Sequence, residues 1–441
     1  MSQLVTTQSI KQTLLKIITN LNKKHDYQFN VTTSNGFSIN CRFKEIENIE
    51  YHNDTGMVVT VFNDYKKGTA STNDLSSESI EKTIAKAENI SKNTQPDEYQ
   101  GLPESNFTLS TSKNLGIFYP KDLKTDDMAS IAKTCEEEAF NFDKRIVNSE
   151  GATFSASNNE HMILNTKEAF GSFKSTDYSL SCITLAEENK LMERDYWYSS
   201  ARDYNKLETA KQIGIRAAKR TISRLGAKTI STRSCPVIFS PEMASSLIGS
   251  FLSAISGPAI YKKSSFLLEK LNQKIFPEFI NIKEKPHLAD GSGTKPYDCD
   301  GVLTIEKDIV QNGTLNTYLL DTYSSRKLNM KCTGNGVITN ITMESDLPYP
   351  SNLIETLEDG ILITEMMGSG ANILTGDYSR GAFGYLIKNG KIEHPVTEIT
   401  VASNLLQMFE NIKSIGNDFD LRNNIRTGSI LIDNITIGGT T

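Results

Sequence analysis

The polar segment 320–336, LDTYSSRKLNMKCTGNG, carries more hydrogen-bonding side chains than the exit of a plain hairpin needs. An arginine there can bind a peptide carboxylate or a backbone carbonyl, and glycines in a loop leave room for an extended peptide to bind. A solvated loop with one surface ion pair explains the same residues equally well. As candidate contacts for a peptide substrate or a partner we take Ser324, Ser325, Arg326, Lys327, Thr333, Gly334 and Asn335.

Other chemistry-bearing residues are scattered along the chain. No histidine lies within helical reach of another, so no local pair predicts a metal site; the five are His25, His52, His161, His287 and His394. Asp298 and Asp300 stand in YDCDG, where two carboxylates before a strand more often form a turn with solvated charges than a cation site. Neither a P-loop nor a G-x-S-x-G nucleophile elbow is present.

A helix start at residues 240–249, SPEMASSLIG, follows the short apolar strand VIF. Ser240 would supply an N-cap hydroxyl, Pro241 fixes φ at the first helical position, and Glu242 places a negative charge in the first turn. One face of this helix is apolar and the rest is small, which lets a strand, a partner or a ligand approach closely. Packing within the fold is the default interpretation of such small residues.

The composition limits the class of protein. The 441 residues include 38% hydrophobic and 23% charged residues, which predicts an ordered globular protein, and the length suggests about two or three domains. The net charge is −6 and the basic residues are dispersed, so a nucleic-acid partner is not expected. The amphipathic N-terminus, the unpaired spacing of the six cysteines and the lack of a long apolar stretch predict a cytoplasmic protein without membrane contact.

Two regions make up the N-terminal half. Region 1–124 is predicted as an α+β module with an opening helix, two extended runs around TSNG that end at Phe43, a strand and a second helix. Region 125–232 is predicted as a helix, an antiparallel meander and a helix that ends near Gly226.

Region 233–441 is predicted as a mainly antiparallel β domain, built as a curled sheet or a barrel. Two hairpins there should turn at Asn312-Gly313 and Asn389-Gly390, because this residue pair favours a type I′ turn. The fold class is therefore α+β, with antiparallel sheet-and-helix modules followed by a mainly antiparallel C-terminal domain.

Four segments carry a resemblance to a known family. FNDYKKGTASTNDLSSESIEKTIAKA, LDTYSSRKLNMKCTGNG, TGDYSRGAFGYLIKNGKIEHPVTEITVASNLLQMFENI and the terminal SILIDNITIGG resemble the TldD/PmbA family (modulator of DNA gyrase, peptidase U62), in its PmbA or TldE branch. The resemblance implies a cytoplasmic protein that pairs with a TldD-type subunit in a heterodimeric zinc metalloprotease. Unfolded peptides such as peptide-antibiotic precursors or antitoxins are the implied substrates.

The helix at residue 240 departs from the catalytic branch of that family. In TldD the equivalent helix begins H-E-x-x-x-H, where two histidines bind zinc and the glutamate is the general base, and a late cysteine completes the site. Alignment on Leu247 and Gly249 puts Ser240, Pro241 and Ser245 in those places, and no cysteine follows Cys332. Proline has no polar side chain and a neutral hydroxyl binds zinc poorly. The resemblance thus implies no catalytic residue and no metal ligand in this chain, with zinc in the TldD-type partner.

The expected partners follow from this interpretation. A pseudo-two-fold heterodimer with a TldD-type subunit is expected, together with an unfolded peptide, and a homodimer is an alternative when the partner is absent. Two other functions stay open: a stand-alone metal-independent hydrolase that uses a serine with Lys327 or another lysine, and a DNA gyrase-related regulatory binding protein. The dispersed charge does not support the second of these.

Overall fold

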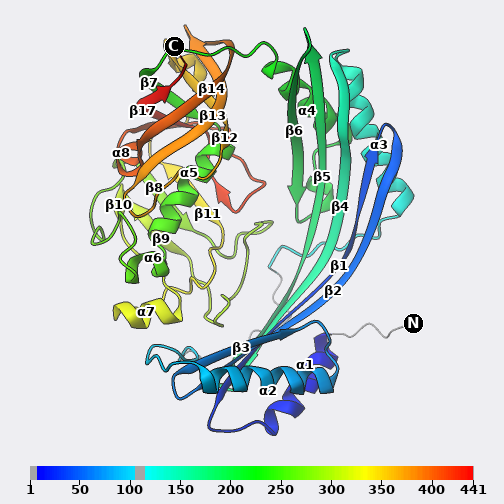
Figure 1. Cartoon of the computed structure of the whole chain (residues 1–441), viewed down its shortest axis with the longest axis vertical. Helices are drawn as coiled ribbons and strands as arrows, with labels where there is room; N and C mark the ends of the chain where they lie inside the picture. The colour runs from blue at the N-terminus through cyan, green and yellow to red at the C-terminus, as the bar shows by residue number, and fades with distance from the viewer. Residues whose placement is uncertain (1–6, 105–114, 441) are drawn as a thin grey trace.

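The computed structural model describes residues 7–104 and 115–440, and its largest feature is a six-stranded antiparallel sheet with the order β3-β2-β1-β4-β5-β6 (Figure 1). Its strands are β1 (Asp26–Arg42), β2 (Glu45–Asn63), β3 (Lys66–Thr72), β4 (Ile146–Asn165), β5 (Phe170–Glu188) and β6 (Leu191–Ala201). Because β1 pairs with both β2 and β4, the first two predicted regions share one sheet.

Strand β1 runs unbroken through TSNG, so the expectation of two separate runs was wrong. Gly36 pairs with His52 on one side and Ser157 on the other, which keeps this segment extended inside the sheet. A Cβ atom on Gly36 would lie 2.1 Å from the Ala156 carbonyl oxygen, so the glycine permits close approach of β4 and marks no turn. The chain reverses instead at Phe43 and Lys44, which have φ angles of 50° and 63°.

Two helix pairs cover different parts of this sheet. Near the lower end in Figure 1, α1 (Thr7–Thr19) and α2 (Ser77–Asn93) pack on β1, β2 and β4, and Leu14, Phe29 and Ile84 are buried among them. Near the other end, α3 (Thr125–Phe142) and α4 (Ala210–Arg224) cover a second core that contains Phe154 and Ala217. The amphipathic N-terminal helix and the helix, sheet, helix order of the second region are confirmed.

The C-terminal region contains a six-stranded sheet with the order β14-β13-β12-β7-β17-β15, in which a further pairing of β14 with β17 closes five strands into a ring. Its strands are β7 (Arg233–Phe239), β12 (Asp359–Met367), β13 (Asp377–Lys388), β14 (Lys391–Asn404), β15 (Ile412–Ile415) and β17 (Ile430–Gly438). Only β7 and β12 run parallel within this sheet. The predicted mainly antiparallel, curled domain is therefore present.

A smaller sheet with the order β10-β9-β8-β11-β16 lies beside this ring. Its strands are β8 (Ile280–Glu284), β9 (Lys307–Gln311), β10 (Thr314–Leu315), β11 (Ile341–Ser345) and β16 (Ile425–Arg426). Four helices complete the region: α5 (Pro241–Ala254), α6 (Gly257–Tyr261), α7 (Thr322–Leu328) and α8 (Leu405–Glu410). Short 3-10 turns occur at Tyr204–Lys206 and Ile354–Thr356.

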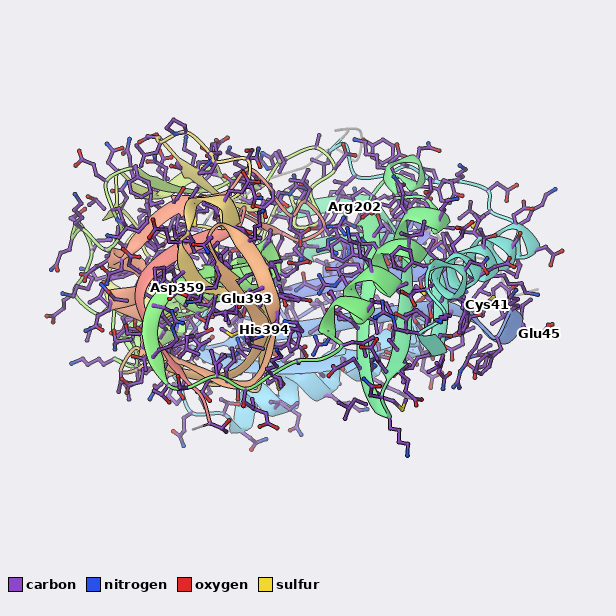
Figure 2. All side chains as sticks on the ribbon, turned by 90° about the horizontal axis from the view of Figure 1, so that it is seen from above. Cys41, Glu45, Arg202, Asp359, Glu393 and His394 are labelled. Atoms are coloured by element: carbon purple, nitrogen blue, oxygen red, sulfur yellow. The ribbon has the colours of Figure 1, made fainter. Side chains whose placement is uncertain are left out.

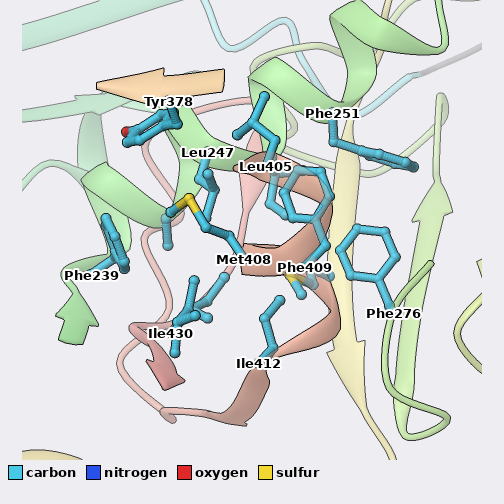
Figure 3. Packing of buried hydrophobic residues seen from close by; sticks show 14 of the residues in the cluster. Phe239, Leu247, Phe251, Phe276, Tyr378, Leu405, Met408, Phe409, Ile412 and Ile430 are labelled. Atoms are coloured by element: carbon cyan, nitrogen blue, oxygen red, sulfur yellow. The ribbon is translucent and has the colours of Figure 1, made fainter. Parts of the chain in front are cut away.

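Both predicted hairpin turns are confirmed, because Asn312-Gly313 joins β9 to β10 and Asn389-Gly390 joins β13 to β14, with positive φ at all four residues. The aromatic rings of Phe251, Phe276 and Phe409 meet in the core between the two sheets, with centroids 4.9 to 5.8 Å apart (Figure 3). This packing fixes α5, which carries the candidate site. In the described part of the chain, no helix is long and apolar enough to cross a membrane.

Candidate functional site

Helix α5 begins directly at the end of β7. The Ser240 amide donates to the Ile363 carbonyl of β12 at 2.9 Å, and Pro241 occupies the first turn, as predicted. The expected N-cap bond is absent: the Ser240 hydroxyl has no hydrogen-bond partner, although the residue is only 7% exposed. Glu242 accepts a bond from Arg422 at 3.0 Å, so an ion pair anchors the first helical turn.

The two faces of α5 have different surroundings. Leu247, Ile248, Phe251 and Leu252 are buried in the C-terminal core, as the sequence predicts. The small residues Ser245, Gly249, Ser250 and Ser253 line a cavity of about 710 Å³ together with residues 423–425. The small face is therefore partly open, and Ile425 of β16 approaches it at Gly249.

A second cavity, of about 680 Å³, lies at the N-terminus of α5 between α4, the end of β6 and segment 418–426. Trp197 forms part of its wall and donates a hydrogen bond from Nε1 to Glu208 at 3.1 Å. The guanidinium groups of Arg216 and Arg422 lie 3.6 Å and 4.0 Å from the centroid of the indole. The Arg422 contact joins the C-terminal region to the N-terminal half at the cavity, whereas Arg216 belongs to α4 of the same half as Trp197.

Arg202 makes a further connection between the two halves (Figure 2). Its guanidinium pairs with Asp177 of β5 at 2.6 Å and donates to the carbonyls of Gly291 and Ser292 in the C-terminal region. The side chain is nearly buried, so these bonds form in a medium where charged hydrogen bonds are strong. One wall of the cavity is consequently held in a fixed position.

The residues at the start of α5 do not fit a zinc ion. Ser240 and Pro241 line the second cavity and Ser245 lines the first, and together they offer two neutral hydroxyls and no imidazole, thiolate or carboxylate. Among the described residues, no group of three or more His, Cys, Asp and Glu side chains is placed to hold a metal ion. The absence of a metal ligand and of a catalytic residue stays a prediction.

The structure places the first half of segment 320–336 in a helix, where the sequence suggested a loop. Asp321 caps α7 by accepting a bond from the Ser324 amide, and the Ser324 hydroxyl donates back to Asp321. The Ser325 hydroxyl donates to the Thr322 carbonyl at 2.8 Å. Both serines are buried and bonded within their own helix. An aspartate three residues before a serine is an N-cap signal that could have predicted this helix.

Arg326 and Lys327 bind a segment of the N-terminal half. Arg326 donates to the carbonyls of Tyr99 and Gly101 at 3.1 Å and to that of Leu102 at 2.6 Å. Lys327 lies 3.7 Å from the Asp97 carboxylate and over the ring of Tyr99. Arg326 therefore binds backbone carbonyls, as the sequence suggested. These carbonyls belong to its own chain and not to a peptide substrate.

Replacing Arg326 with alanine should loosen segment 97–102. The substitution removes three charge-assisted bonds, so amide exchange at Asp97 and Gln100 should accelerate by about 10- to 100-fold in a hydrogen-exchange measurement. Lys331 is exposed and lies in segment 320–336 with Arg326, so Lys331→Ala serves as the control and should leave exchange at residues 97–102 unchanged. Equal protection in wild type and Arg326→Ala would show that the segment is held by other contacts.

Thr333, Gly334 and Asn335 belong to a turn that is bonded to the protein interior. The Thr333 hydroxyl accepts the Leu320 amide at 2.7 Å, and Gly334 has a φ angle of 70°. Asn335 donates to the buried Glu284 carboxylate at 2.9 Å. The seven residues are thus brought near one another around α7, but the polar side-chain atoms described here bind within the chain. Contact with a substrate or partner stays a prediction.

The acidic pair in YDCDG forms the predicted turn, but its charges are not both solvated. Asp298 is buried and accepts bonds from the amides of Asp300, Val302 and Gly336 at 2.8 to 3.0 Å. Burial, followed by the charge of Asp300, raises the pKa of the Asp298 carboxyl to about 6. Asp300 accepts the Thr322 amide at the start of α7. The pair therefore positions segment 320–336.

Comparison with known families agrees with this geometry. Residues 30–91, 118–225 and 232–439 match, in this order, domain 1, the central domain and the C-terminal domain of the PmbA/TldA metallopeptidases. The chain is 38% identical to Metalloprotease PmbA of Escherichia coli O157:H7 over 93% of its own length and 91% of that protein. The chain belongs to the PmbA/TldD metallopeptidase family. A Metalloprotease PmbA homolog of Haemophilus influenzae is 39% identical, with the same two shares covered.

Solved structures of PmbA/TldD-type proteins share the fold. A candidate modulator of DNA gyrase from Bacteroides thetaiotaomicron superposes with a TM-score of 0.92 at 29% identity, covering 99% of this chain and 100% of that one. TldE from Thermococcus kodakarensis superposes with a TM-score of 0.83 at 18% identity, covering 98% and 100%. The latter likeness shows the PmbA/TldD fold alone.

Sequence reasoning did not find the second cavity. Trp197, Arg202, Arg422 and Arg426 come from distant parts of the chain and meet only in the fold. The spacing of Arg422 and Arg426, four residues apart in DLRNNIRTG, is the one local sign that basic side chains gather there. It does not identify the indole or the helix start that they meet.

Proposed function

We propose that this chain is the non-catalytic subunit of a two-chain zinc metallopeptidase, in which a TldD-type partner holds the metal. One observation carries the proposal: α5 begins at a cavity with Ser240, Pro241 and Ser245 at the positions where the resemblance to the TldD branch implies two histidines and a glutamate. These side chains can neither bind zinc nor take a proton from water.

The proposal implies two subunits that share one fold. The chain is 22% identical over 432 residues to a Metalloprotease TldD homolog of Buchnera aphidicola, so a TldD-type subunit would share the domain plan. Two similar subunits can meet through an approximately two-fold interface. The expected substrate is an unfolded peptide, such as a peptide-antibiotic precursor or an antitoxin, and the expected location is the cytoplasm.

The role left to this chain is structural and selective. Strand β6 is the last strand of its sheet, and residues 199–201 at its end line the second cavity. An extended peptide can pair with such a strand edge through main-chain hydrogen bonds. We propose that this chain completes a closed chamber, orders the zinc helix of the partner and holds the peptide extended.

The two alternatives have less support. A serine and lysine hydrolase needs a free nucleophile, whereas Ser324 and Ser325 are bonded within α7 and Lys327 pairs with Asp97. A DNA gyrase-related regulatory role, suggested by the description of the Bacteroides protein, draws no support from the net charge of −6.

Substitution of Ser245 by alanine tests the assignment inside the complex. With a TldD-type subunit added, wild type and Ser245→Ala should cleave an unstructured peptide at rates within about twofold of each other, since Ser245 is not a ligand. A chelator should abolish both activities. If this chain supplied the metal site, loss of a ligand would lower kcat/KM by about 100-fold or more, and the proposal would be wrong.

A further inference from the structure

The outer edge of β6 meets side chains of the same chain at a place where another strand could add. Strand β6 is the last strand of its sheet and lies nearest to the C-terminal region (Figure 1). In an antiparallel strand, the N–H and C=O groups of every second residue point to the same edge. Nη1 of Arg422, in the C-terminal region, donates to the Tyr198 carbonyl at 3.1 Å. Tyr198 therefore presents its backbone groups to the outer edge, and so does Tyr196.

The Tyr196 amide has a partner at this edge as well. It donates to Oδ1 of the neighbouring Asp195 at 2.7 Å. A strand that paired with β6 here would use the Tyr196 N–H as a donor and the Tyr198 carbonyl as an acceptor. Both groups are already bonded by side chains, so the edge is occupied at residues 196–198.

Arg422 is held firmly in its position. Its Nε and Nη2 donate to the two carboxylate oxygens of Asp420 at 2.8 and 2.9 Å, and Nη2 also donates to Glu242 at 3.0 Å. The side chain is only 11% exposed, and its guanidinium lies over the Trp197 ring. A peptide that displaced Arg422 from Tyr198 would have to move a cation fixed by two carboxylates, which is costly at a nearly buried site.

Asp195 is fixed in a similar way from the other side of the strand. Its side chain is 9% exposed and lies between two guanidinium groups of α4, at 3.4 Å from Arg220 and 3.6 Å from Arg224. The carboxylate that accepts the Tyr196 amide therefore cannot turn away without breaking these ion pairs. The two blocking side chains thus belong to separate ion-pair networks.

The end of the strand beyond this block lies at a cavity. Residues 199–201 line the second cavity, and so does Arg422. The volume of about 680 Å³ lies within the range of about 300 to 1,000 Å³ that is usual for ligand sites. The blocked residues 196–198 therefore stand at the boundary between the cavity and the rest of the β6 edge.

We propose that Arg422 and Asp195 limit the length of β6 that an extended peptide can pair with, so that pairing is confined to residues 199–201 at the cavity. Arg422 acts as a positioning residue, because a bound peptide must end its strand pairing where the guanidinium covers the Tyr198 carbonyl. The choice of a peptide rests on the proposed function, in which an extended peptide pairs with this strand edge.

A labelled peptide tests this limit on the purified full chain. The probe is N-acetyl-Thr-Val-Thr-Val-Thr amide with a fluorescein label, because β-branched residues favour an extended chain and the peptide is longer than the open end of β6. Fluorescence anisotropy measures its affinity. An analogue that is N-methylated at every residue has no backbone N–H donors, so it cannot pair as a strand.

Replacing Arg422 with alanine should free the Tyr198 carbonyl and lengthen the pairing. The peptide should then bind about 10-fold or more tightly than it binds to wild type, since added backbone bonds contribute on this scale. The N-methylated analogue should gain nothing. Hydrogen exchange in β6 should slow when the peptide binds to Arg422→Ala, which locates the added strand.

Arg216→Ala is the matched control. Arg216 also lies over the Trp197 ring, at 3.6 Å, and pairs with Glu208, but its removal leaves the bond between Arg422 and Tyr198 in place. Its affinity for the peptide should stay within about twofold of wild type. If Arg422→Ala fails to fold, Arg422→Met keeps an unbranched side chain over the indole, lacks the donor and should show the same gain.

Two outcomes overturn the proposal. One is equal affinity of wild type and the folded Arg422 variant for the peptide, including the absence of binding to both at millimolar concentration. The other is an equal gain for the N-methylated analogue, which would show that the peptide does not pair as a strand.

The result is separable from that of the proposed function. A gain in strand pairing in Arg422→Ala, with no peptidase formed by wild type and a TldD-type subunit, would overturn the function and leave the blocked edge. Peptidase activity of the complex, with no gain in Arg422→Ala, would overturn the blocked edge and leave the function.

Discussion

Replacing Lys307 with methionine is expected to lower the free energy of unfolding by about 3 to 5 kcal/mol. Lys307 Nζ lies 2.7 Å from Glu284 Oε2 and donates to the Thr333 carbonyl and to Asn335. The side chains of Glu284 and Lys307 are 1% and 11% exposed, so methionine would leave a buried carboxylate without its counter-ion. Thr339 and Asn335 still donate to Glu284, but neutral donors do not replace the charge.

Urea unfolding followed by circular dichroism measures this loss. Lys283→Met is the matched control, because Lys283 stands on the same strand as Glu284 and pairs with Asp308 at 3.9 Å in an exposed position; it should cost at most about 1 kcal/mol. The double substitution Glu284→Gln, Lys307→Met removes both charges and should recover much of the stability. A loss in Lys307→Met no larger than in Lys283→Met would contradict a buried network.

Replacing Trp197 with alanine should cost about 3 to 5 kcal/mol, the usual range for truncation of a large buried aromatic side chain. Trp197 is 5% exposed and packs in the core beneath α4, while Arg216 and Arg422 lie over its ring. The substitution opens a hole in the wall of the second cavity and removes the surface against which segment 418–426 rests.

Thermal unfolding by circular dichroism and hydrogen exchange across residues 418–426 report the two effects. Trp197→Phe keeps most of the ring contact and should recover more than half of the stability. Exchange in segment 418–426 should rise in Trp197→Ala and much less in Trp197→Phe. If exchange there is the same in wild type and in Trp197→Ala, then the indole does not hold this segment.

Local signals predicted the elements that depend on neighbours in sequence. The Asn-Gly pairs fixed both hairpin turns, since positive φ at two successive residues is a local requirement. Pro241 and the apolar stripe from Leu247 onward predicted α5, because capping and periodicity are also local. These features need no knowledge of tertiary contacts.

The misinterpreted segments depend on contacts that are distant in sequence. Gly36 resembles a turn residue, and only the pairing of β1 with β4, more than a hundred residues later, explains it as a point of close approach. Segment 320–336 seemed rich in unused polar groups because its partners are elsewhere: Arg326 binds carbonyls near residue 100, and Asn335 binds Glu284. A sequence shows donors but not the acceptors they meet.

The candidate site was predictable only in part. Ser240, Pro241 and Ser245 could be compared with the H-E-x-x-x-H motif from the sequence alone. That comparison predicts that the two zinc-binding histidines and the general base are missing. What surrounds the helix start could not be predicted, because the cavity is assembled from β6, α4 and segment 418–426. The unsatisfied Ser240 hydroxyl is visible only in the structure, since the sequence rules assign it to the helix cap.

The metal content and peptidase activity of the purified chain test the central claim most directly. The chain alone should bind less than about 0.1 zinc per molecule and cleave no unstructured peptide, because two serine hydroxyls and a proline do not make a zinc site. Addition of a TldD-type subunit should give one zinc per pair and proteolysis that a chelator stops. Stoichiometric zinc in the chain alone, with peptide cleavage that a chelator abolishes, would contradict the non-catalytic assignment.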